Sequence, residues 1–285
     1  MLKIQKKLLS YRMLTFTHTY ALLQAFEKQC RREGTYPSPE LVLGNVIPDF
    51  ITHLGREEYQ KLAHDLTLLH PSAAWTGLEW GMIFHILCDN YSTLGRISFE
   101  GDYHEFRKDG FIEQRANAVQ MTVPLHVPGR RVLQCALDIL VLQEEKDTLI
   151  RSLAGAANCL TEHGDAIVAR IADLYGISAS RLEVGMRRFL KIYGREFIHQ
   201  AASQEYRLFP LVRSLLDLDT LSEPGHLLSE IRKHPELMEL IDVNMGIIKQ
   251  DWRRLLEEMV EATFTFPGMM QALACDSSLP GVESE

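Results

Sequence analysis

The chain has 285 residues, of which 46% are hydrophobic, and a formal net charge of -8 at pH 7. This apolar content suffices for one large core or two small ones. The acidic balance argues against a nucleic-acid-binding surface, because contacts to phosphates require a basic stripe. No apolar run approaches the roughly 18 residues of a membrane-spanning helix, so we expect no transmembrane segment.

Cysteine usage indicates a reducing compartment. The five cysteines lie singly along the chain, without a C-x-x-C pair. An odd number of scattered cysteines favours free thiols over a disulfide framework. We therefore predict a cytoplasmic location.

Residues 1–12, MLKIQKKLLSYR, are predicted to be a basic N-terminal extension. They are not typical of a signal peptide, because Arg12 interrupts the apolar stretch and no small-residue cleavage site follows before His18. The sequence leaves open whether Met13 is the true start.

The first half of the chain reads as helical, with apolar residues at spacings of three and four. We predict helices over 13–32, 79–95 and 129–151. The run LVLGNVIPDF is broken by Gly44, Asn45 and Pro48, so Asp49 is predicted to lie at a loop-to-helix junction. Residues 98–128 contain many breakers and are predicted to be an irregular or short-helical flap.

The second half continues the helical pattern, and no repeat of fixed period is present. Helices are predicted over 156–175, 180–190, 196–216, 224–232 and 235–264. The fold class is therefore all-α, a multi-helix bundle. We divide it into the extension 1–12, a metal-binding helical core 13–150, a C-terminal helical region 151–272 packed on that core, and a disordered tail 273–285.

His85 and Asp89 lie inside the apolar run of the helix predicted over 79–95. Four residues apart on a helix, they share one face. Burial of an unpaired carboxylate is costly, so Asp89 needs a partner. The candidates are a metal ion or His85 itself, the latter making a purely structural pair.

Seven of the eleven histidines precede Val127, as do two carboxylates in apolar surroundings. Imidazole and carboxylate donors on helices suit zinc, manganese or iron. A carboxylate shared by two ions is typical of two-metal hydrolytic sites. The candidate set is His18, Asp49, His64, His85 and Asp89.

The order T-H, L-G-N-V-I-P-D-F, L-A-H-D-L-T and F-H-I-L-C-D-N-Y-S-T resembles the zinc-dependent phospholipase C family and its relatives, the helical three-zinc nucleases. The resemblance covers roughly residues 1–140 and implies a bundle of that type with additional C-terminal helices. It implies that the five candidate residues hold a zinc pair, with Asp89 as the bridge.

The chain departs from the family pattern at the third zinc. The further histidine expected after the H-x-x-x-D helix is absent, and the later H-x-x-x-E pair is replaced by Arg130 or Arg131 and Gln134. We therefore expect at most two ions, with His104 and His126 as outside candidates for replacement ligands. Secreted members also use their mature N-terminal residue as a ligand, which leaves the ion at His18 one ligand short.

The predicted function is a metal-dependent hydrolase of phosphoric esters with two zinc ions, or manganese or iron in their place. Asp49 would ligate one ion and act as the base. Arg96 would bind a substrate phosphate, or it is simply a cation at a helix C-terminus. The substrate is a phospholipid or a soluble phosphoester, the latter being favoured by the cytoplasmic location.

Two alternatives remain open. In an HD-type metal phosphohydrolase, His64 and Asp65 would be the adjacent ligand pair and Asp49 would be idle. In a non-catalytic helical scaffold, the metal site would be degenerate and the C-terminal helices would bind a protein partner. The sequence does not predict the oligomeric state.

Overall fold

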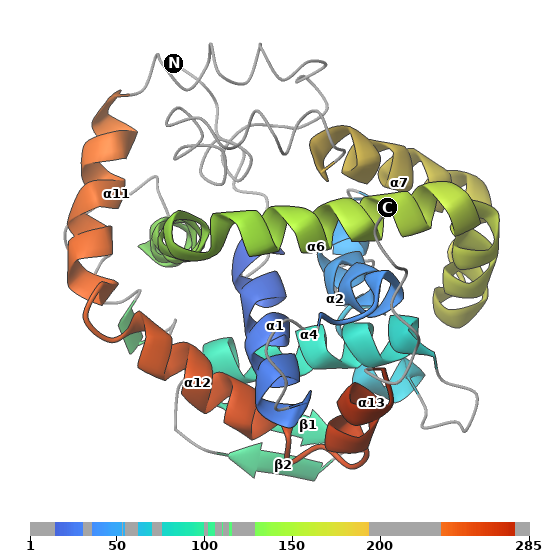
Figure 1. The fold of residues 1–285 in the computed structure, drawn as a ribbon, viewed down its shortest axis with the longest axis horizontal. Helices are drawn as coiled ribbons and strands as arrows, with labels where there is room; N and C mark the ends of the chain where they lie inside the picture. Colours follow the sequence, from blue (N-terminus) through green and yellow to red (C-terminus); the bar gives the residue numbers. More distant parts are fainter. Residues whose placement is uncertain are drawn as a thin grey trace.

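The computed structural model describes residues 15–30, 36–52, 54, 62–69, 76–99, 102–105, 110, 114–115, 129–193 and 235–276. Helices dominate these residues, which confirms the predicted all-α class (Figure 1). The elements are α1 (Thr15–Cys30), α2 (Pro39–Thr52), η1 (Leu66–Leu68), α4 (Gly77–Leu94), β1 (Arg96–Phe99), β2 (Asp102–Glu105), α6 (Gly129–Tyr175), α7 (Ala179–Tyr193), α11 (Pro235–Ile248), α12 (Trp252–Thr263) and α13 (Met269–Asp276).

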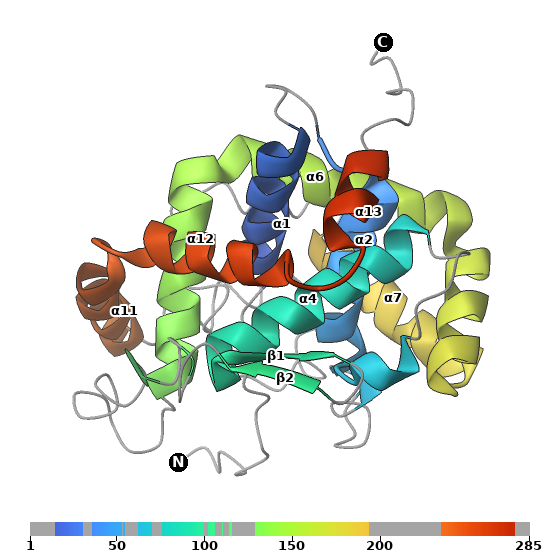
Figure 2. The same ribbon diagram turned by 90° about the horizontal axis from the view of Figure 1, so that it is seen from below.

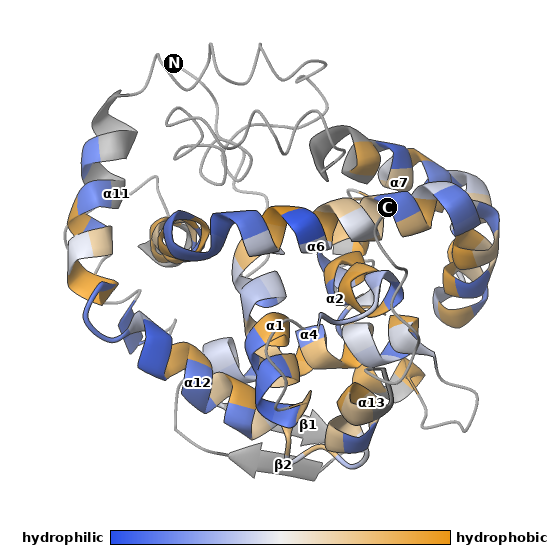
Figure 3. Cartoon of the chain, in the orientation of Figure 1, coloured by the Kyte–Doolittle hydropathy of each residue, from blue (hydrophilic) through white to orange (hydrophobic). Residues whose placement is uncertain are grey.

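Helices α1, α2 and α4 form the centre of the fold, and the long helix α6 packs against α1 and α2. Figure 2 shows α12 and α13 lying against α1 and α4. Hydrophilic and hydrophobic residues alternate along α12 (Figure 3), and the buried ones include Trp252, Leu255 and Met259. This amphipathic helix therefore closes one side of the core.

Two glycines bring α2 and α4 into backbone contact. A Cβ atom at Gly44 would lie 2.0 Å from the carbonyl oxygen of Leu78, and one at Gly81 would lie 2.2 Å from that of Leu41. No side chain larger than hydrogen fits at either position. The crossing therefore places the main chain of α2 directly beside the side chains of α4.

The predicted break around residues 44–48 is wrong. Helix α2 runs continuously from Pro39 to Thr52 with Pro48 inside it, so Asp49 lies within the last turns of a helix and not at its start. Gly44 serves the close crossing with α4 and does not interrupt the helix.

Other boundaries differ from prediction where local signals were weak. Part of the predicted flap is an antiparallel hairpin, in which Ile97 pairs with His104. Helix α6 spans the predicted gap at 152–155, and the domain boundary at 150 falls inside it; its non-helical residues are Glu145 and His163. The helix predicted over 235–264 is divided into α11 and α12, and Asp251 occupies the N-cap position of α12.

Three predicted segments lie outside the described residues, namely the extension 1–12 and the helices predicted over 196–216 and 224–232. The predicted start of the tail at 273 is wrong, because α13 continues to Asp276 and buries Leu273 completely. Residues 277–285 lie outside the described residues.

Within the described residues, no helix is long and apolar enough to span a bilayer. The side chains of four cysteines are described, and all four are free thiols, namely Cys30, Cys88, Cys135 and Cys159.

The glycine crossing predicts a strong effect of one methyl group. Gly81→Ala places a Cβ atom 2.2 Å from the carbonyl oxygen of Leu41 and 2.6 Å from the amide nitrogen of Asn45. We expect it to lower the free energy of unfolding by about 1–3 kcal/mol, because overpacking forces the backbones apart. Urea unfolding followed by circular dichroism measures the change.

Gly246→Ala is the matched control, since a Cβ atom at this helical glycine of α11 meets nothing within 4 Å. It should raise stability by about 0.5–1 kcal/mol, the ordinary gain for alanine in a helix. If both variants shifted stability equally, the backbone contact between α2 and α4 would not be a packing constraint.

Candidate functional site

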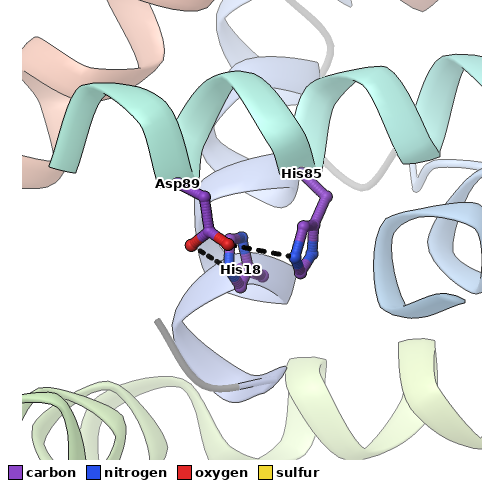
Figure 4. Close-up of side chains that lie close together, drawn as sticks. All are labelled: His18, His85 and Asp89. Carbon is purple, nitrogen blue, oxygen red and sulfur yellow. Dashed lines mark hydrogen bonds and ion pairs between the residues drawn. The ribbon is translucent and has the colours of Figure 1, made fainter. Parts of the chain in front are cut away.

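Helix α4 presents His85 and Asp89 on one face, as the spacing predicts. The helix is fixed at both ends: the N–H of Thr76 donates to Glu79 Oε2 at 3.0 Å in a capping box, and Gly95 ends it with φ 69°. The four-residue spacing brings the Nε2 atom of His85 to 3.5 Å from Asp89 Oδ2. Figure 4 shows both side chains directed from α4 toward His18.

His18 reaches the same point from α1. Its Nε2 atom lies 3.2 Å from Asp89 Oδ1, and the ring is completely buried. The imidazoles of His18 and His85 stack, with centroids 3.7 Å apart and planes 17° apart. Two helices distant in sequence therefore direct parallel imidazoles at one carboxylate.

His64 and Asp49 complete the cluster. The Nε2 atom of His64, just before η1, lies 3.1 Å from Asp89 Oδ2, and its ring meets that of His85 edge-on. Asp49 Oδ1 on α2 lies 3.9 Å from His85 Nε2. The structure thus brings together all five residues that the sequence singled out.

A main-chain contact fixes the orientation of His85. Its Nδ1 atom lies 2.7 Å from the carbonyl oxygen of Asn45, which can only accept a hydrogen bond. Nδ1 therefore carries a proton, and in the neutral ring Nε2 offers its lone pair to the cluster. His85 Nε2 and His18 Nδ1 are buried and have no hydrogen-bond partner in the described structure.

Burial and charge shift the pKa values of the cluster in opposite directions. Burial alone would raise the pKa of Asp89, but the neighbouring His18 and His85 lower it well below the ordinary value. Burial lowers the pKa of His18, and the adjacent His85 adds to the effect. For His85, burial opposes protonation, yet contacts with Asp89 and Asp49 raise its pKa. Asp89 is therefore held as a carboxylate, and the imidazole of His18 is favoured in its neutral form.

Asp138 on α6 is a buried carboxylate that the sequence interpretation missed. Both the N–H and the Oγ1 hydroxyl of Thr17 donate to its Oδ1 atom, at 2.7 and 2.6 Å. It thus caps the first turn of α1 next to His18. Burial, and then the charge of Asp49, raise the pKa of Asp138 to about 7, against the lowering effect of the Thr17 hydrogen bonds. The available signal in the sequence was a lone aspartate inside an apolar run, VLQCALDILVL.

The donor spacing fits a divalent cation. Ligands about 2.1 Å from a tetrahedral ion lie ~3.4 Å from each other. The four contacts between imidazole and carboxylate measure 3.1, 3.2, 3.5 and 3.9 Å. Within the described part of the chain, His18, His85 and Asp89 also form a group whose ligand atoms all lie within 4.8 Å of one another.

The remaining candidates are only partly described. Arg96 begins β1 and pairs with Glu105, and His104 lies in β2, but the side chains of both are outside the described structure. His126 lies outside the described residues altogether. Asp65 is half-buried, next to His64.

Comparison with known proteins identifies no family for the chain. It matches no protein-family model, no curated protein and no solved structure.

The raised pKa of Asp138 predicts a pH-dependent stability. Between about pH 4 and 7 the folded protein holds a proton that the unfolded chain releases, so the contribution of this group falls as the pH rises. Asp138→Asn removes this loss while keeping an acceptor for Thr17. The difference in free energy of unfolding between Asp138→Asn and wild type should therefore increase by about 3 kcal/mol, in favour of the variant, as the pH rises from about 4 to 7.

Urea unfolding in the presence of a chelator, at pH values from about 4.5 to 7.5, measures this difference. Thr161→Ala on the same helix carries no ionisable group and should shift stability equally at every pH. A pH-independent effect of Asp138→Asn would show that this carboxyl titrates alike in the folded and unfolded chains.

Proposed function

We propose that this chain is a metal-dependent hydrolase of phosphoric esters that uses a two-metal site. The observation that carries the proposal is the division of contacts at Asp89. Its Oδ1 atom faces His18, whereas its Oδ2 atom faces His64 and His85. A carboxylate placed between two groups of imidazoles in this way is suited to bridge two cations.

The stacked imidazoles supply a second argument. Their centroids are 3.7 Å apart, and both Nε2 atoms face the Asp89 carboxylate. Two-metal hydrolytic sites hold their ions about 3.5–4 Å apart. Parallel rings at this spacing are therefore suited to hold one ion each.

The donor set favours zinc, with manganese or iron as alternatives, because it mixes imidazole nitrogen with carboxylate oxygen. His18 and one oxygen of Asp89 would hold the first ion. His64, His85, Asp49 and the other oxygen of Asp89 would hold the second. The first set is incomplete, as expected for a chain that departs from the phospholipase C pattern.

When bound, two such cations lower the pKa of a water molecule and neutralise charge on phosphoryl oxygens. Asp49 is the proposed base, since its carboxylate lies beside the cluster and is 7% exposed. One O–H bond of water breaks, and the proton passes to Asp49 and then to the leaving oxygen. A new P–O bond forms as the ester P–O bond breaks.

The substrate class is a phosphoester, either soluble or a phospholipid, and Arg96 is a proposed phosphate contact. Free thiols at four cysteines support a cytoplasmic location, which favours a soluble phosphoester as the substrate.

The position of Asp49 favours this function over an HD-type phosphohydrolase. That alternative leaves Asp49 idle, whereas Asp49 Oδ1 lies 3.9 Å from His85 Nε2.

Metal binding tests the proposal directly. Chelator-treated protein should take up about two zinc ions per chain by calorimetry and should then hydrolyse bis(p-nitrophenyl) phosphate. Asp89→Asn should abolish both, since it removes the shared charge. His163→Ala, at an exposed imidazole of α6, is the control and should leave both unchanged.

Asp65→Asn separates the two enzyme hypotheses. Retained zinc binding supports the phospholipase C type, and lost binding supports the HD type. A wild-type chain that binds no zinc, manganese or iron would instead be a scaffold with a degenerate site.

A further inference from the structure

Asn45 on α2 is a completely buried side chain whose amide is unused. Neither its Nδ2 nor its Oδ1 atom has a hydrogen-bond partner in the described structure. Polar groups buried this deeply are almost always paired, with protein or with an ordered water. The unpaired amide of Asn45 therefore indicates that a polar ligand binds there, most simply a water molecule.

The main chain of Asn45 lies beside the cluster. The Asn45 carbonyl oxygen accepts the hydrogen bond from His85 Nδ1, so the backbone of residue 45 touches the imidazole. Asp49 follows one helical turn later, and its carboxylate lies 3.9 Å from the opposite nitrogen of the same ring. Residues four apart share a helix face, so Asn45 and Asp49 both face His85 from α2.

We propose that the Asn45 carboxamide is a positioning residue that holds the water activated at this site, with Nδ2 donating to the water oxygen. This inference rests on the proposed hydrolase function. A hydrogen bond to a charged acceptor is stronger than one to a neutral acceptor, so this donor favours the deprotonated water. Asp49, on the same face, receives the proton that the water releases.

Cobalt-loaded protein gives a readout that does not depend on turnover. The visible absorption of cobalt changes when its water ligand loses a proton, so a pH titration gives a midpoint. We expect Asn45→Ala to raise that midpoint by about one pH unit, a tenfold effect, which is the size expected for the loss of one charge-assisted hydrogen bond. Asn45→Asp should raise it further, because it replaces the donor by a negative charge.

Cobalt stoichiometry should stay at the wild-type value in both variants, since Asn45 is not a ligand and every substitution keeps the carbonyl that orients His85. Asn244→Ala is the matched control: it removes another buried amide, on α11, which packs against α6. Its midpoint should equal that of wild type. If Asn45→Ala fails to fold, Asn45→Ser and the near-isosteric Asn45→Asp test the same point.

An unchanged midpoint in the Asn45 variants, with cobalt still bound, would overturn this positioning role and leave the metal site intact. Loss of cobalt from these variants would also overturn it, by making Asn45 a ligand. Failure of the wild-type chain to bind cobalt would overturn the proposed function itself.

Discussion

The site depends on one buried charge. Asp89 is 4% exposed, and an isolated carboxylate at that depth is strongly unfavourable. Imidazoles from three separate segments offset this cost, those of His18, His64 and His85. Loss of any one imidazole would leave part of the buried charge of Asp89 uncompensated, so this carboxylate links the three segments that carry them. The core and the donor cluster are therefore stabilised by the same contacts.

Main-chain contacts between α2 and α4 fix the orientation of the His85 imidazole. Gly44 and Gly81 let α2 and α4 approach until the carbonyl oxygen of Asn45 reaches His85 at 2.7 Å. A backbone carbonyl in a helix moves less than a side chain, so it orients the imidazole more firmly than a side-chain acceptor would. The same approach carries Asp49 to the other side of the ring. The crossing of α2 and α4 therefore both packs the core and positions His85 and Asp49 in the cluster.

Apolar periodicity, helix-ending glycines and residue spacing in the sequence correctly predicted features that are local to one helix. The period of apolar residues and Gly95 identified α4 and its end, and the four-residue spacing put His85 and Asp89 on one face. Gly44 and Pro48 misled the prediction, because glycine marks close packing as well as loops, and tertiary contacts hold a proline inside a helix. Asp138 was missed because its role depends on Thr17, 121 residues away, and no local pattern encodes such a contact.

The contact between Thr17 and Asp138 has a consequence for biosynthesis. All five donors leave the ribosome before residue 138 has been made, so a nascent chain presents them while the first turn of α1 still lacks its cap. A cation captured at that stage would meet donors in an unfinished geometry. The first turn of α1 gains this acceptor only when α6 docks, so the segment that carries His18 depends on a contact with a part of the chain made much later.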